Sequence, residues 1–133
     1  MSEDNLEIVQ RAVDAVNRRD KEGWLALNAA DVEFRADPDW PESRWLRGRE
    51  TVWDFLIEIL GVWEPADFEP VEVLPADQDK VVAHYRASLR AKASGIVSEF
   101  DYWYVATIRD GLTARHEWFS NRGAALQAAG LPD

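Results

Sequence analysis

The chain has 133 residues, of which 47% are hydrophobic and 30% charged, and its formal net charge is −10. A chain of this length predicts one domain, spanning residues 1–133, that buries roughly two-thirds of its unfolded surface. The acidic balance argues against a nucleic-acid partner, which needs clustered Lys and Arg, and the absence of Cys excludes disulfides, thiolate nucleophiles and Cys metal sites.

The N-terminal stretch is acidic and amphipathic, which is not the pattern of a signal peptide or a membrane span. We therefore expect a cytoplasmic protein without a membrane partner. Beginning at a cap, Ser2 or Asp4, apolar residues recur every three or four positions, which predicts an amphipathic helix of about four turns. The apolar stripe consists of Leu6, Val9, Val13 and Val16.

A second, shorter helix is expected over residues 21–28, with Asp20 as its N-cap. Residues 31–36 alternate like a strand. They lead into a loop in which Pro38 and Pro41 prevent regular strand pairing.

A third helix is expected to open at residues 48–51 and to present a wide apolar face until Pro65 ends it. The pattern then changes to strands, and a short helix over 122–129 closes the chain, with Gly130 as its stop. The expected strands are residues 68–74, 80–91, 100–108 and 112–120. The apolar odd positions of 80–91 indicate its buried face.

The last two strands form a long hairpin around Asp110-Gly111, a dipeptide that is the strongest short-range signal for strand reversal. Along the first strand, Tyr102 and Tyr104 share a face with other apolar residues. Along the second, Glu117 shares a face with Arg115 and Phe119, whereas His116 and Trp118 lie on the other. A carboxylate amid so much aromatic surface is a candidate for chemistry.

Helices followed by a meander of strands indicate an α+β fold with an antiparallel sheet. The order and several short strings resemble the nuclear transport factor 2-like superfamily, specifically its SnoaL-like branch. These strings are residues 8–13 with Asn17 and Asp20, then 31–34, 47–50, 108–111, 124–126 and 128–130. The resemblance implies a cystatin-like cone, in which a curved antiparallel sheet wraps around the N-terminal helices and encloses a pocket, and it implies homodimers that pair through the sheet.

The superfamily includes ketosteroid isomerases, limonene-epoxide hydrolases, polyketide cyclases, dehydratases and members that only bind, so the fold does not select an activity. In the isomerase pattern, the proton-removing carboxylate before a proline falls on Asp37. The pattern's first-helix tyrosine falls on Ala12, and its protonated aspartate falls near Tyr104. The resemblance therefore offers a base but an incomplete set of oxyanion donors.

In the epoxide hydrolase pattern only the last-strand acid remains, at Glu117, because the arginine and the first aspartate fall near Tyr85 and Ala87. The polyketide cyclase pattern also places its acid–base carboxylate near Glu117, and it is the least contradicted comparison. With the sheet arranged as a cone, we expect Tyr104 and Glu117 to point inward and Trp103 and Trp118 outward.

Two interpretations of Glu117 remain open. In an aromatic cavity its pKa would rise and it would exchange protons near neutrality; paired with Arg115, Arg86 or Arg90 it would be structural. Tyr104 is either a hydrogen-bond donor to a substrate oxygen or packing surface. Asp37 is either a base at the pocket mouth or a turn-forming residue. The candidate ligand-binding residues are Tyr85, Arg115, Trp40, Phe34, Tyr102 and Phe119.

We expect no metal, because His84 and His116 fall on the face opposite the candidate pocket and lack a third ligand. The outward Trp103 and Trp118 favour a dimer contact. The leading hypothesis is a cofactor-independent isomerase, cyclase or hydrolase that uses a pocket carboxylate as general acid–base on a small, apolar, carbonyl-bearing molecule. The alternative is a non-catalytic binding module for an apolar metabolite.

Overall fold

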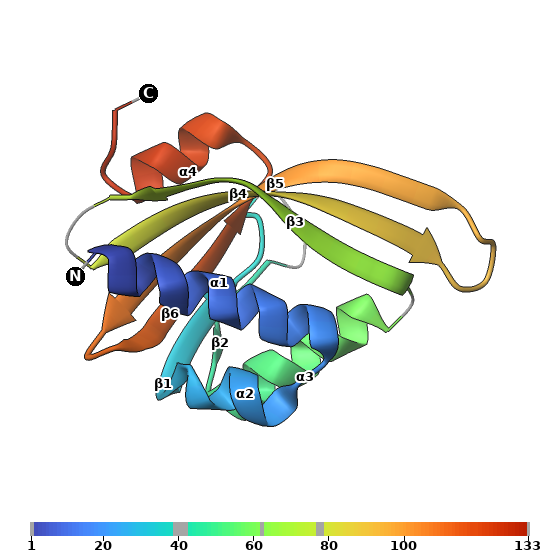
Figure 1. Cartoon of the computed structure of the whole chain (residues 1–133), viewed down its shortest axis with the longest axis horizontal. Helices are drawn as coiled ribbons and strands as arrows, with labels where there is room; N and C mark the ends of the chain where they lie inside the picture. Colours follow the sequence, from blue (N-terminus) through green and yellow to red (C-terminus); the bar gives the residue numbers. More distant parts are fainter. Residues whose placement is uncertain (1, 39–42, 62, 77–78, 133) are drawn as a thin grey trace.

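The computed structural model describes residues 2–38, 43–61, 63–76 and 79–132. Six strands form one sheet in the order β2-β1-β6-β5-β4-β3. In Figure 1 the sheet curves around α1, while α4 lies on its other side. The expected α+β cone is thus confirmed, but the sheet is not wholly antiparallel, because β1 and β6 are parallel. The elements are α1 (Ser2–Arg18), α2 (Lys21–Ala26), β1 (Asn28–Arg35), β2 (Leu46–Arg47), α3 (Arg49–Leu60), β3 (Trp63–Pro75), β4 (Lys80–Ala91), β5 (Val97–Arg109), β6 (Leu112–Phe119) and α4 (Arg122–Ala128).

Most element boundaries agree with the sequence pattern. Asp20 caps α2, since its Oδ1 accepts the Gly23 N–H at 3.0 Å. The end of α3 was predicted wrongly, because the helix stops at Leu60 and Pro65 belongs to β3. Because β3 is the last strand in the order, a proline there removes no ladder hydrogen bond from a central position. None of the described helices is long and apolar enough to cross a membrane.

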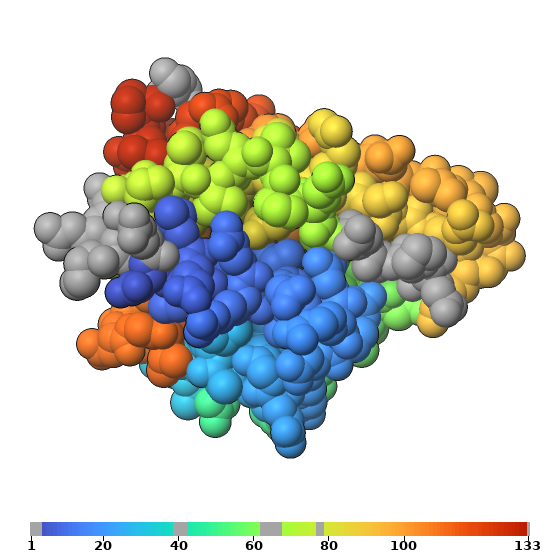
Figure 2. All heavy atoms as spheres, viewed as in Figure 1, coloured from blue at the N-terminus to red at the C-terminus, as the bar shows by residue number. Residues whose placement is uncertain are grey.

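The concave face of the sheet packs against α1. Val9 of α1 lies among Ala83, Tyr85 and Tyr104 of β4 and β5, and each of the four is at most 4% exposed. On the face shown in Figure 2, α1 runs across the middle of the molecule with β3 along one side and α2 along the other. The odd positions of β4 from Val81 to Leu89 are buried on the concave face, as their apolar pattern predicts, and the even-numbered Val82 is buried on the opposite face.

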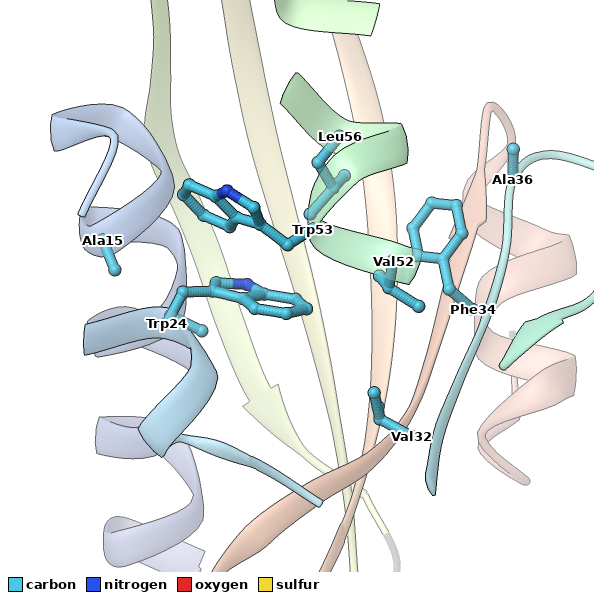
Figure 3. Close-up of a cluster of buried hydrophobic side chains, with 9 residues drawn as sticks. Ala15, Trp24, Val32, Phe34, Ala36, Val52, Trp53 and Leu56 are labelled. Carbon is cyan, nitrogen blue, oxygen red and sulfur yellow. The ribbon is translucent and has the colours of Figure 1, made fainter. Parts of the chain in front are cut away.

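A second cluster joins α1, α2, β1 and α3 at the lower end of the sheet. Figure 3 shows the ring of Trp53 above that of Trp24, with Phe34 beside Val52. The two indole centroids are 5.6 Å apart. These aromatic rings fill the space between α2, β1 and α3.

The convex face carries α4, whose Ala125 and Leu126 pack on Val82, Val105 and Phe119. The side chains of the sheet therefore divide into an inner set that faces α1 and α3 and an outer set that faces α4 or the surface. Which residue belongs to which set decides which side chains can reach a ligand.

The β5–β6 hairpin contains a bulge that changes the expected sets. Asp110 and Gly111 have φ of 54° and 77°, and the strands begin in the register of a two-residue turn. After the pair Ile108–Thr113 the register shifts, so that Thr107 pairs with Arg115 and Ala114 is left unmatched. One extra residue reverses the faces of everything beyond it.

The bulge makes the orientations predicted for three residues wrong. Trp118 pairs with Tyr104 and lies on the concave face, not the convex one, and His116 lies there with it. Glu117 pairs with Val105 and lies on the convex face.

Candidate functional site

Two adjoining cavities border the concave face of the sheet. The inner one lies against α1, α2 and α3, whereas the outer one lies against α3 and extends past the end of β6 to Asp101 and Phe119 of the convex side. The inner one measures about 40 Å³ and includes Trp24, Phe34, Tyr104 and His116 in its wall. The outer one measures about 280 Å³ and includes Asp37, Phe100, Phe119 and Ser120. Among the described residues, four line both cavities, so the two lie side by side; these are Leu60, Phe68, Tyr102 and Trp118.

The outer cavity is an aromatic chamber that contains a buried carboxylate. Asp37 follows β1 and is only 5% exposed, and its Oδ2 accepts the backbone N–H of Ser120 at 2.9 Å. Because Ser120 follows β6, this hydrogen bond orients the Asp37 carboxylate at the ends of two neighbouring strands. Five of the described residues in the lining of this chamber are aromatic: Phe68, Phe100, Tyr102, Trp118 and Phe119.

Asp101 is the second carboxylate in the wall of the outer cavity. Its Oδ1 lies 3.0 Å from His84 Nε2 and accepts from Arg86 Nε at 3.3 Å. The hydrogen bond to His84 and the nearby Arg86 hold the pKa of Asp101 below its ordinary value. Asp101 is therefore an ion-pair partner on the sheet and a poor candidate for a base.

The inner cavity has a polar end made of three connected side chains. The Tyr104 hydroxyl is hydrogen-bonded to His116 Nδ1. His116 Nε2 lies 2.6 Å from Asn28 Oδ1, and Asn28 Nδ2 donates to the carbonyl of Trp24 at 2.7 Å. The imidazole is stacked between the rings of Tyr104 and Trp24, at centroid distances of 5.4 and 5.8 Å.

Burial fixes the protonation of these groups. It lowers the pKa of His116 to about 3 and raises that of Tyr85 to about 12. It also raises the pKa of Tyr102 and Tyr104 above the ordinary value of 10.0. Around neutral pH, the interior thus holds a neutral imidazole and protonated phenols.

Glu117 does not point into either cavity, so the inward orientation expected for it is wrong. Its Oε2 accepts from Arg35 Nη2 at 3.2 Å on the convex side, and the Glu117 side chain is 11% exposed. An arginine partner for Glu117 was one of the two interpretations of the sequence, but the partner is Arg35 of β1 and not an arginine of β4 or β6. A catalytic role for Glu117 stays a prediction, and its position argues against one.

Arg115 accompanies Glu117 on the convex face and is also not among the described lining residues. It donates to Glu33 at 2.8 Å. Its guanidinium and that of Arg35 each lie 4.7 Å from the ring of Trp45. This is a surface cluster, so a ligand contact in the cone would require Arg115 to change faces.

The remaining predicted residues divide as follows. Phe34 lines the inner cavity, Phe119 the outer, and Tyr102 both. Tyr85 is 1% exposed and is not among the described lining residues of either cavity. Trp40 lies outside the described residues.

Sequence reasoning missed His116 and Trp118 as pocket residues, because strict alternation from the turn placed both on the convex face. The sequence contains a weaker indication that Trp118 could face the pocket. Trp118 and Phe119 are both bulky and adjacent, which indicates that β6 is covered on both sides and leaves the inner face undecided.

The two histidines do not form a metal pair. His84 stacks on Trp103 on the convex side, with centroids 4.5 Å apart, whereas His116 lies inside the cone. Within residues 2–38, 43–61, 63–76 and 79–132, no group of three His, Asp or Glu side chains is arranged to hold a metal ion.

Residues 9–116 match the model of the SnoaL-like domain, and no curated protein matches the chain. The Mycobacterium tuberculosis protein Rv0760c in complex with estradiol-17β-hemisuccinate is 22% identical, with a TM-score of 0.76 over 88% of this chain and 93% of its own. TerC, co-crystallised with polyporic acid, is also 22% identical, with a TM-score of 0.76 over 95% and 97% of the two chains. A nuclear transport factor 2-like protein from Burkholderia xenovorans LB400 is 26% identical, with a TM-score of 0.74 over 96% and 95%.

Proposed function

This chain belongs to the SnoaL-like domain family, and we propose that it is a cofactor-independent enzyme that transfers a proton on a small, largely apolar, carbonyl-bearing molecule. Asp37 is the proton acceptor and donor, and Tyr102 donates a hydrogen bond to the carbonyl oxygen. An isomerase, a cyclase and a hydrolase can each use such a pair. The observation that carries the proposal is the buried Asp37 carboxylate in the wall of an aromatic cavity.

The surroundings of Asp37 suit a general base. A carboxylate that is shielded from water and lies beside an apolar substrate removes a proton from carbon more readily than one that is fully hydrated. The Ser120 N–H holds Oδ2 at 2.9 Å and so fixes the orientation of the carboxylate. A fixed orientation reduces the entropy lost when the substrate reaches its reactive position.

Tyr102 is the tyrosine that lines both cavities, so its ring borders the space beside Asp37. Burial raises its pKa, and the hydroxyl therefore stays protonated as a donor. Negative charge that develops on a carbonyl oxygen during enolisation is stabilised by such a donor. We assign this role to Tyr102 because the Tyr104 hydroxyl is already hydrogen-bonded to His116.

The size and lining of the cavities support an organic substrate with a ring system. The outer chamber of about 280 Å³ lies just below the usual range for ligand pockets, roughly 300–1,000 Å³, and the inner cavity extends it. The small-molecule complexes of Rv0760c and TerC support the same kind of occupant.

Deuterium exchange at the α-carbon of 2-tetralone tests the proposal, because exchange requires proton removal but no complete reaction. NMR in D₂O measures the rate. The wild-type protein is expected to accelerate exchange over buffer, and Tyr102→Phe is expected to slow it by about tenfold or more, since lost oxyanion donors cost about that much or more. Equal rates for both proteins would remove Tyr102 from the proposal.

The alternative function is a non-catalytic binding module for an apolar metabolite. It is favoured by the lining of the outer cavity, in which aromatic and aliphatic groups outnumber the polar ones. It predicts saturable quenching of fluorescence from Trp118, which lines both cavities, and no chemical change in the ligand after prolonged incubation.

A further inference from the structure

The hydrogen bonds at the polar end of the inner cavity permit a single placement of protons. Asn28 Nδ2 must face the Trp24 carbonyl, 2.7 Å away, because two oxygens would repel at that distance. Asn28 Oδ1 then faces His116 Nε2 at 2.6 Å, so Nε2 carries the hydrogen. The neutral ring leaves a lone pair on Nδ1, and the Tyr104 hydroxyl donates to it.

The other arrangements each create a repulsive contact or a buried charge. The opposite tautomer would place the lone pair of His116 Nε2 against Asn28 Oδ1. A doubly protonated ring is disfavoured because burial lowers the pKa of His116 to about 3. His116 and Asn28 are thus positioning residues, which direct the hydroxyl hydrogen of Tyr104 away from the cavity.

Tyr104 can therefore only accept a hydrogen bond from a ligand. This is the reverse of the donor role that the sequence comparison suggested. The described lining of the inner cavity contains no carboxylate, so nothing there compensates a cationic donor. A neutral donor is the group that fits.

We propose that the inner cavity binds a hydroxyl group of the ligand, which donates its hydrogen to the Tyr104 oxygen. A volume of about 40 Å³ suffices, since one water needs roughly 10–15 Å³. The rest of the molecule occupies the outer chamber. Phe68, Tyr102 and Trp118 line both cavities and would contact the ligand where the two meet. As a statement about the substrate this rests on the proposed function, and it names the class: a ring compound with a carbonyl near Asp37 and a hydroxyl at its far end.

Calorimetric titration with matched probes tests the hydroxyl site. The probes are 2-naphthol, naphthalene and 2-methoxynaphthalene, which present a donor, no polar group and an acceptor on one skeleton. The wild-type protein is expected to bind 2-naphthol about 3–10-fold more tightly than either of the others, the worth of one neutral hydrogen bond. Equal binding of all three, or tighter binding of 2-methoxynaphthalene, overturns the proposal.

Paired variants assign the preference to one oxygen. Tyr104→Phe is expected to reduce the preference for 2-naphthol to within about twofold, since one hydrogen bond is lost. Tyr85→Phe removes a hydroxyl from the same sheet face but outside the described cavity wall, and it should keep the preference. A preference that survives in Tyr104→Phe contradicts the assignment.

Nitrogen-15 NMR of His116 in the wild-type protein gives an independent test that needs no variant. A neutral ring with hydrogen on Nε2 is expected at pH 7. Hydrogen on Nδ1, or an imidazolium, overturns the inference. Because 2-naphthol has no carbonyl, a failure here leaves the exchange of 2-tetralone unaffected, and a failure of that exchange leaves this site unaffected.

Discussion

The backbone of Tyr104 pairs with that of Trp118 across the β5–β6 hairpin, one position away from the register in which the strands leave the Asp110-Gly111 turn. The unmatched residue, Ala114, is what separates the two registers. Without Ala114, Tyr104 would pair with Glu117. The Glu117 carboxylate would then lie on the concave face, at the position that the Trp118 ring occupies. Because of the bulge, Glu117 is not among the described lining residues of either cavity, whereas Asp37 lines the outer one.

Glu117→Gln is expected to destabilise the protein without impairing ligand binding. The substitution removes the charge that pairs with Arg35, whose side chain is 29% exposed, and the cost should be about 1–2 kcal/mol in urea unfolding. Glu33→Gln, which weakens the more exposed pair with Arg115, is the control and should cost less than about 1 kcal/mol. A loss of 2-naphthol binding in Glu117→Gln would contradict the convex position of this residue.

His116 makes stability depend on pH in the acidic range. The folded protein keeps the ring neutral down to a pKa of about 3, whereas the unfolded chain takes up the proton near the ordinary value of 6.5. The contribution of His116 is therefore complete above pH 6.5 and is lost as the pH falls toward 3, by up to about 1.4 kcal/mol per pH unit.

Urea unfolding of the wild-type protein and His116→Gln between pH 7 and pH 4.5 measures this effect. Gln can still accept from Tyr104 and donate to Asn28, so the substitution chiefly removes the titrating group. The unfolding free energy of the wild type should fall more steeply than that of the variant. Parallel slopes would contradict a neutral, buried ring.

Tyr85→Phe is expected to stabilise the protein. The Tyr85 hydroxyl is buried and has no hydrogen-bond partner in the part of the chain that the structure describes. Removing an unsatisfied hydroxyl should raise the free energy of unfolding by about 0.5–1 kcal/mol, whereas Tyr104→Phe, which breaks the bond to His116, should lower it by about 1 kcal/mol. Destabilisation of equal size in both variants would show that Tyr85 has a partner.

We predict a homodimer that forms through the convex face of the sheet. Trp45 is 41% exposed there, and the side chain of Trp103 is partly exposed on the same side. Exposed aromatic surface of this kind usually marks an interface. Trp118, which the sequence pattern assigned to the dimer contact together with Trp103, lines the inner cavity instead.

Sedimentation at micromolar concentration should give twice the 15.2 kDa mass of the chain. Trp103→Glu should shift the protein toward monomer, whereas Leu112→Glu at the hairpin tip should not. A monomeric wild-type protein would contradict the prediction.

Much of the fold could be predicted because local signals agree with it. The stripe through Val9 marks the buried side of α1, and the odd positions of β4 mark its inner face. Asp110-Gly111 locates the hairpin turn, since both residues have positive φ. Each of these signals acts within a few residues, where a single sequence carries the information.

The site was harder to predict, because it depends on register between distant strands. Alanine is not a residue type that predicts a bulge. The bulge at Ala114 nevertheless determines whether Tyr104 pairs with Glu117 or with Trp118. The bond between Asn28 and His116 joins residues 88 positions apart. Asp37 could be identified only as a candidate, since its hydrogen bond with Ser120 joins residues 83 positions apart.

The most direct test compares Asp37→Asn with Glu117→Gln in the deuterium exchange of 2-tetralone. Asn keeps an oxygen that can accept the Ser120 N–H, so the fold should persist, and circular dichroism checks this. The wild type and Glu117→Gln should accelerate exchange equally, and Asp37→Asn should lose about 100-fold or more, the usual share of a general base. Exchange that survives in Asp37→Asn or disappears in Glu117→Gln would contradict the account, and no acceleration by the wild type would favour the binding module.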